Sequence, residues 1–125
     1  MVTLLPEEKV KLILYKNSMQ YTDLTEISSK EVLPGFHGKF VHSENMTTAY
    51  WDIVAGSEIP EHSHEQEQIV NLIEGEFELI VDGELIKLYS EGVVVIPSNV
   101  KHSGKAVSHC KLIDIFHPAR EDFKF

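Results

Sequence analysis

The sequence lacks a second cysteine, so the chain can form no internal disulfide bond. The single cysteine, Cys110, opens the apolar stretch Cys110–Phe116. A thiol in such a stretch is expected to pack as a small hydrophobic side chain in a strand rather than act as a nucleophile.

Positive charge is also scarce: 11 lysine and arginine residues face 20 aspartate and glutamate residues, for a net charge of −9. Proteins that bind nucleic acids or anionic membrane surfaces need a basic patch, so this balance predicts neither kind of partner. A small anionic ligand remains compatible, because a metal ion and one arginine can dominate the field inside a pocket.

Long hydrophobic runs are missing as well. No window approaches the ~18 apolar residues of a membrane-spanning helix, and the first residues do not combine a cationic start with a long apolar core. We therefore expect a soluble, cytoplasmic protein. A chain of 125 residues has room for one compact domain.

Turn signals recur about every eight to twelve residues, which is typical of an all-β sandwich or barrel. The pair Asp82-Gly83 predicts a hairpin. From these signals and the alternation of apolar residues, strands are predicted at residues 36–42, 46–55, 69–73, 76–81, 84–89, 93–96 and 107–116. We assign residues 31–125 to the barrel domain.

Residues 1–30 are predicted to form an N-terminal extension. Pro6-Glu7-Glu8 could open a short helix, since proline and acidic residues favour the first helical turn. The alternation of Val10, Leu12 and Leu14 with lysines fits a strand equally well, including one exchanged with a neighbouring subunit. Both interpretations stay open.

The functional signal is concentrated between Gly56 and Gly75. Residues two apart on a strand point to the same face, so His62 and His64 are expected to direct their imidazoles at one point. Gln68 follows as a further candidate ligand, and His102 comes after a run of aliphatic residues. Three histidines and an amide predict a mononuclear metal site in a small barrel.

This spacing resembles the first motif of the cupin family, in which two histidines and usually a glutamate lie between two glycines. The segment from Gly92 to His102 resembles the second cupin motif, with Pro97 before the last histidine, although it is one residue shorter between Gly92 and Pro97. The resemblance covers about residues 31–122. It implies a double-stranded β-helix, or jelly-roll, barrel that is often a homodimer.

Gln68 stands where many cupins have glutamate, so the set His62, His64, Gln68 and His102 would add no negative charge to a bound metal. A divalent transition metal, such as zinc, nickel, iron, manganese or copper, would keep its full charge and act as a strong Lewis acid. Glu67 is the competing ligand, but strand alternation turns it away from the face of Gln68.

The C-terminal residues carry a further resemblance. Asp114 and Phe116 share one face of the last predicted strand, and Arg120 follows just after it. This ending resembles that of the small cupins of pectin degradation, which convert unsaturated uronate monosaccharides into their linear, ketonised form. The resemblance implies that Asp114, Phe116 and Arg120 act on the substrate. Structural roles remain open: Phe116 and Trp51 could be core residues, Asp114 could pair with a buried amide or with Arg120, and Arg120 could form a surface ion pair.

We therefore predict a metal-dependent, isomerase- or lyase-like enzyme acting on a small anionic sugar. One alternative is a cupin that binds a metal or a sugar without catalysis. Another is a different mononuclear metalloenzyme, such as an oxygenase or another isomerase, because one such site supports many chemistries.

Overall fold

The computed structural model describes residues 13–14 and 19–125. Near its start, β1 (Ile13–Leu14) and β2 (Gln20–Tyr21) pair as a short antiparallel ribbon, and η3 (Leu24–Glu26) follows. The helix considered at Pro6-Glu7-Glu8 lies outside the described residues. The exchange of a strand between subunits and the domain boundary at residue 30 stay predictions.

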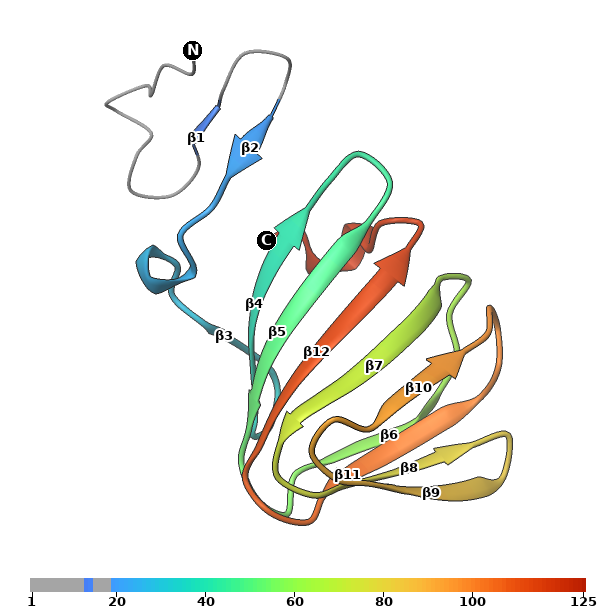
Figure 1. Cartoon of the computed structure of the whole chain (residues 1–125). Helices are drawn as coiled ribbons and strands as arrows, with labels where there is room; N and C mark the ends of the chain where they lie inside the picture. Colours follow the sequence, from blue (N-terminus) through green and yellow to red (C-terminus); the bar gives the residue numbers. More distant parts are fainter. Residues whose placement is uncertain (1–12, 15–18) are drawn as a thin grey trace.

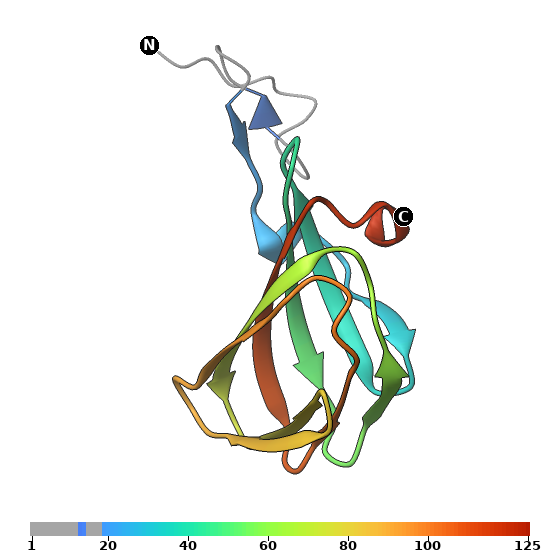
Figure 2. The same cartoon turned by 90° about the vertical axis from the view of Figure 1, so that its right-hand side faces the viewer.

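Two antiparallel sheets face each other and enclose the interior (Figures 1 and 2). The larger has the order β10-β7-β12-β5-β4-β3, and the smaller has the order β6-β11-β8-β9. Their strands are β3 (Lys30–Leu33), β4 (Phe36–His42), β5 (Thr47–Ile53), β6 (Glu58–His62), β7 (Glu67–Glu74), β8 (Phe77–Val81), β9 (Glu84–Leu88), β10 (Val93–Ile96), β11 (His102–Ala106) and β12 (Cys110–His117). The all-β prediction is confirmed.

The only helical segments in the described part of the chain are two 3-10 turns, η3 and η4 (Glu121–Phe123). Neither has the length and apolar character that crossing a membrane would require. The second turn lies at the C-terminal end, beside the top of β12 (Figure 1).

Alternation along the strands builds the core between the two sheets. In β12, residues Cys110, Leu112, Asp114 and Phe116 are buried, while the residues between them are exposed or half-buried. The pleat of a strand produces this pattern, because successive side chains point to opposite faces. The interior is filled by large aliphatic side chains, of which Ile53, Leu72 and Ile96 are almost fully inaccessible.

The turns follow the sequence signals. Asp82 and Gly83 join β8 to β9 with φ values of 49° and 81°, the left-handed conformation that a two-residue hairpin loop requires. Gly75 has φ of 103°, and a Cβ there would lie 2.3 Å from the carbonyl oxygen of His109. The closing glycine of the first motif is therefore needed both for its backbone conformation and for a close approach of two chain segments.

One predicted strand begins later than expected, and other strands were not predicted. The strand expected at residues 107–116 begins only at Cys110, because the backbone N–H groups of Val107 and Ser108 turn to the carbonyl oxygen of Glu76. The polar segment His102–Ala106 forms β11, although its sequence shows little strand preference. Pairing with both β6 and β8 supplies its backbone hydrogen bonds. Likewise, β3 occupies Lys30–Leu33, before the first strand that the sequence predicts, at residues 36–42.

Candidate metal centre

Three histidines meet at the open end of the barrel. His62 is the last residue of β6 and pairs in register with His102, the first residue of β11. His64 lies two residues beyond β6, so the expectation that both members of the first pair lie on one strand is wrong: the strand ends at His62. The three side chains nevertheless converge, and one ring nitrogen from each lies within 4.8 Å of the others.

Each imidazole is oriented by a backbone carbonyl. The Nδ1 atoms of His62, His64 and His102 lie 2.8, 2.8 and 2.9 Å from the carbonyl oxygens of Pro60, Gln66 and Val100. A carbonyl oxygen only accepts hydrogen bonds, so Nδ1 carries the proton in each neutral ring and Nε2 keeps its lone pair. Carbonyls that orient metal-binding imidazoles in this way are common in metal sites.

The ring nitrogens and the Gln68 oxygen have lone pairs that could bind a cation. Nε2 of His102 is buried and has no hydrogen-bond partner among the described residues. Nε2 of His64 lies 3.1 Å from Oε1 of Gln68. With the proton of His64 on Nδ1, both of these atoms are acceptors and cannot bond to each other. The cluster could hold a metal ion, which would satisfy all of these lone pairs at once.

Burial keeps the imidazole rings of His64 and His102 neutral. The pKa of His102 is lowered to about 4, chiefly because burial penalises its charged form, while its bond to the carbonyl of Val100 acts in the opposite direction. Burial, followed by the nearby charge of Arg120, also lowers the pKa of His64. Neutral imidazole is the form that binds metals, so protons compete weakly for these two ligands near neutral pH.

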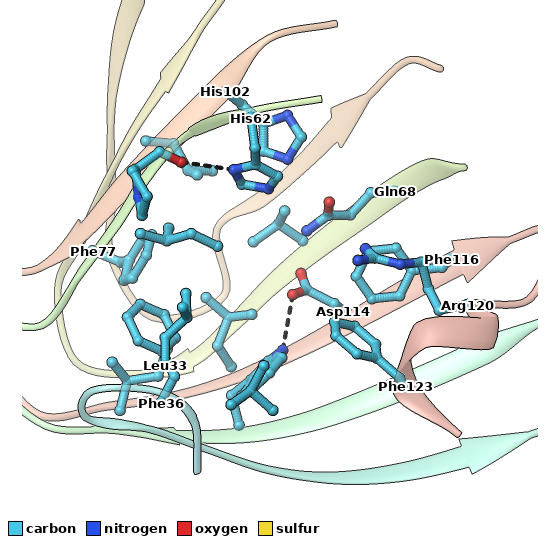
Figure 3. A pocket seen from close by; sticks show the side chains of 18 of the residues that line it. Leu33, Phe36, His62, Gln68, Phe77, His102, Asp114, Phe116, Arg120 and Phe123 are labelled. Carbon is cyan, nitrogen blue, oxygen red and sulfur yellow. Dashed lines mark hydrogen bonds between the residues drawn. The ribbon is translucent and has the colours of Figure 1, made fainter. Parts of the chain in front are cut away.

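Gln68 points inward from β7 and is buried beside the histidines, and Glu67 is exposed on the other face of the strand. Figure 3 shows Gln68 between His62 and Asp114. Gln68 and Glu67 therefore point to opposite faces of β7, as strand alternation predicted.

Asp114 lies on β12, paired with Ala49 and Val70, and its carboxyl group is buried. Its Oδ2 accepts a hydrogen bond of 3.0 Å from Trp51 Nε1, and its Oδ1 has no partner among the described residues. Burial raises the pKa of Asp114 to about 7, against the opposing effects of the Gln68 amide, the Trp51 indole and Arg120. Such a carboxyl can give or take a proton near neutral pH.

Arg120 follows β12 and turns back over the cavity mouth (Figure 3). Only 12% of its side chain is exposed, and it forms a bidentate pair with Asp122. The surface ion pair considered for Arg120 thus exists, but its guanidinium also packs on the rings of Phe116 and Phe123, at 4.8 and 4.2 Å from their centres.

These groups line one cavity of about 340 Å³ in the barrel (Figure 3). Its polar wall carries His62, Gln68, His102, Asp114, Arg120 and Asp122. Much of the remaining wall is apolar and includes Phe36, Ile53, Val70, Phe77 and Leu79. The predicted metal ligands and the predicted substrate residues therefore share one chamber, apart from His64, which belongs to the histidine cluster but does not line the cavity.

Two residues of this site were not singled out by the sequence. Trp51 was assigned to packing, yet it both lines the cavity and binds Asp114. The sequence offered one signal for Trp51: it lies two residues from both Ala49 and Ile53, and side chains two apart on a strand point to the same face. Phe123 lines the cavity from η4 and gave no signal in the sequence.

The remaining histidines lie outside the cluster. His109 pairs with Asp52 at 2.6 Å, and His37 lies 3.7 Å from Glu31. Cys110 is buried, and burial raises the pKa of its thiol, so it lacks the character of a nucleophile.

Residues 49–116 match the model of the cupin domain. The chain belongs to the cupin family. No curated protein matches this cupin at a significant level of sequence similarity. The predicted double-stranded β-helix is thereby confirmed, together with the family resemblance.

Among solved structures, this cupin is similar to KdgF from a Halomonas species, with 28% identity and a TM-score of 0.75 over 78% of this chain and 92% of that one. It is also similar to an RmlC-like cupin from Shewanella frigidimarina, with 26% identity and a TM-score of 0.79 over 82% and 94% of the two chains.

A salicylate 1,2-dioxygenase from Pseudaminobacter salicylatoxidans shares the fold at 20% identity and a TM-score of 0.66. The match covers 69% of this cupin and 27% of the dioxygenase.

Proposed function

We propose that this cupin is a metal-dependent enzyme that converts unsaturated uronate monosaccharides into their linear, ketonised form. The observation that carries the proposal is Asp114, a buried carboxyl with a pKa of about 7 in the cavity that borders the histidine cluster, whose Oδ1 has no partner within the described part of the chain. The similarity to KdgF and the resemblance of the C-terminal segment to pectin-degradation cupins support the choice of substrate.

In this proposal His62, His64, Gln68 and His102 hold one divalent transition metal ion, such as zinc, nickel, iron or manganese. The three Nε2 lone pairs and the Gln68 oxygen are the donors that the residues offer. All four are neutral, so an ion held by them would keep its charge and would supply Lewis acidity toward the oxygens of a substrate.

Asp114 moves the proton. As a carboxylate it takes the proton of the anomeric hydroxyl, the bond between C1 and the ring oxygen breaks, and an aldehyde and an enolate result. Protonated Asp114 then gives this proton to C4 as the enolate becomes a ketone, so no atom is gained or lost overall. A pKa of about 7 leaves both forms of Asp114 populated at neutral pH, as these two steps require.

Arg120 and Phe116 bind the substrate. A guanidinium binds a carboxylate in a planar, bidentate manner, so Arg120 at the cavity mouth would receive the carboxylate of the uronate. The ring of Phe116 lies against both His64 and Arg120 and would cover a face of the sugar. The homodimer and the cytoplasmic location expected from the sequence stay predictions.

The test follows the absorbance of the conjugated double bond of an unsaturated uronate monosaccharide. The wild-type protein should remove this absorbance, Asp114→Asn should lose nearly all turnover while keeping its metal, and chelated wild type should be inactive until metal is restored. Turnover by Asp114→Asn at the wild-type rate would refute the role of Asp114.

The same experiment separates the alternatives. A metal-loaded protein that binds the sugar without loss of absorbance would be a binding module. Oxygen consumption that depends on iron would indicate an oxygenase instead.

A further inference from the structure

Asp122 and Arg120 form a side-on ion pair at the mouth of the cavity. Arg120 Nε donates to Asp122 Oδ1 at 2.9 Å, and Nη2 donates to Oδ2 at 2.7 Å. This geometry uses two of the five N–H groups of the guanidinium and leaves the edge formed by Nη1 and the second Nη2 hydrogen free. A second carboxylate can therefore bind end-on while Asp122 stays in place.

The free edge faces the cavity. Figure 3 shows the terminal nitrogens of Arg120 directed toward Gln68 and Asp114. The root of the side chain is anchored too, because the backbone N–H of Arg120 donates to Thr47 Oγ1 at 2.8 Å. Thr47 is fully buried, so this anchor belongs to the rigid barrel.

Phe116 and Phe123 restrict the guanidinium further, with Cζ 4.8 and 4.2 Å from their ring centres. They leave its in-plane orientation to a hydrogen-bonding partner, and Asp122 is the residue that supplies one. The pKa of Asp122 is held below its usual value, first by this hydrogen bonding to Arg120, so it is present as a carboxylate.

We propose that Asp122 is a positioning residue, which holds Arg120 with its end-on edge aimed into the cavity and thereby selects ligands that carry a carboxylate. This inference rests on the proposed function in one respect, namely that the ligand is a sugar acid. Asp122 itself does not contact the substrate in this arrangement.

The negative charge of Asp122 also favours ligands that carry a carboxylate. The ring of Phe116 lies against both Arg120 and His64, so Arg120 is near the cluster and would be repelled by a metal ion held there. The carboxylate of Asp122 offsets this repulsion and keeps Arg120 turned toward the cavity. Without it, the long side chain regains several rotamers, and binding a carboxylate must order it again.

The experiment measures binding of D-glucuronate, a saturated uronate, by the metal-loaded protein in a calorimeter. Its uncharged methyl ester serves as the second ligand. We expect Asp122→Asn to weaken glucuronate binding by about tenfold or more, since a charge-assisted contact becomes misaligned. Binding of the methyl ester should change by less than about twofold.

Glu121→Gln is the matched control, because Glu121 lies on the same turn, is exposed and pairs only with Lys124 among the described residues. It should bind both ligands as the wild type does. In turnover, Asp122→Asn should raise KM and leave kcat close to the wild-type value, and Asp122→Glu should restore part of the lost affinity.

Equal weakening of both ligands by Asp122→Asn would mean a general disturbance of the turn and would overturn the inference. Unchanged glucuronate binding, or no glucuronate binding by the wild type, would overturn it as well. Selective loss of glucuronate binding in a protein that does not ketonise uronates would uphold the inference and refute the proposed function. The two can thus fail separately.

Discussion

Trp51 donates its indole N–H to Oδ2 of Asp114, at 3.0 Å, from the neighbouring strand β5. The bond fixes one oxygen of a buried carboxyl group and leaves the other without a partner among the described residues. A residue that the sequence assigns to packing thus orients the group proposed to transfer the proton. The proposed proton transfer therefore depends on residues of two strands, and it can be tested at a residue outside the histidine cluster.

Trp51→Phe should raise the pKa of Asp114 further. The indole N–H stabilises the carboxylate, so its loss favours the protonated form. In the pH profile of kcat/KM, the limb that reports the ionisation of Asp114 should move to higher pH by up to about one unit. Tyr50→Phe, on the opposite face of the same strand, is the control and should leave the profile in place. An unmoved limb in Trp51→Phe would contradict the coupling.

Removal of Asp114 should change how stability depends on pH in chelated protein. Its folded pKa of about 7 lies above the value of 3.8 usual for a solvent-exposed aspartate, so the folded state binds the extra proton between these values. The free energy of unfolding contributed by this group is full below about pH 4 and is lost as the pH rises through about 7, at ~1.4 kcal/mol per pKa unit.

Burial acts on His64 and His102 with the opposite sign, because their lowered pKa values make acid destabilising. The informative quantity is therefore the difference between wild type and Asp114→Asn in urea unfolding at pH 5 and pH 8. Asp114→Asn should gain stability relative to wild type at the higher pH. A difference that does not vary with pH would show that Asp114 titrates normally.

His102→Ala should abolish stoichiometric metal binding. His102 is the most buried of the three imidazoles, and its Nε2 is oriented by the bond from Nδ1 to Val100. Loss of a ligand from a site of this kind typically lowers metal affinity by orders of magnitude, whereas loss of a supporting contact costs about 10–100-fold. Metal content measured after dialysis should fall to background, and His109→Ala, outside the cluster, should retain the metal.

Gln68→Glu should tighten metal binding and slow turnover. The substitution would add a negative charge beside His64, which attracts a cation and reduces the charge that the metal presents to substrate oxygens. A competition titration with a chelator would measure the first effect, and the uronate absorbance assay the second. Faster turnover in Gln68→Glu would show that the neutral ligand set is not what the reaction uses.

Leu72→Ala should destabilise the barrel by about 2–5 kcal/mol, because Leu72 is completely buried between the sheets and its removal leaves a cavity. Leu85→Ala provides the matched control, since Leu85 is 56% exposed on β9, and it should cost less than about 0.5 kcal/mol. Urea unfolding of both variants measures the difference. Equal losses would place Leu72 outside the core.

The sequence by itself determined much of the architecture. Alternation predicted the inward face of β12 with Asp114 and Phe116, and it separated Gln68 from Glu67, because the side-chain direction on a strand depends only on local parity. The resemblance of the motifs of His62, His64 and His102 to those of cupins predicted that the three would come together, although His64 lies beyond the strand that ends at His62. The glycines around the first pair predicted the turns.

Only the tertiary structure decided which residues complete the site. Trp51 meets Asp114 because β5 pairs with β12 in one register, and Arg120 meets Asp122 and Phe123 because the chain turns into η4 at the cavity mouth. The strand β11 exists because β6 and β8 lie on either side of it. Such contacts depend on the pairing of segments distant in sequence or on the path of a turn, and neither parity nor composition contains that information.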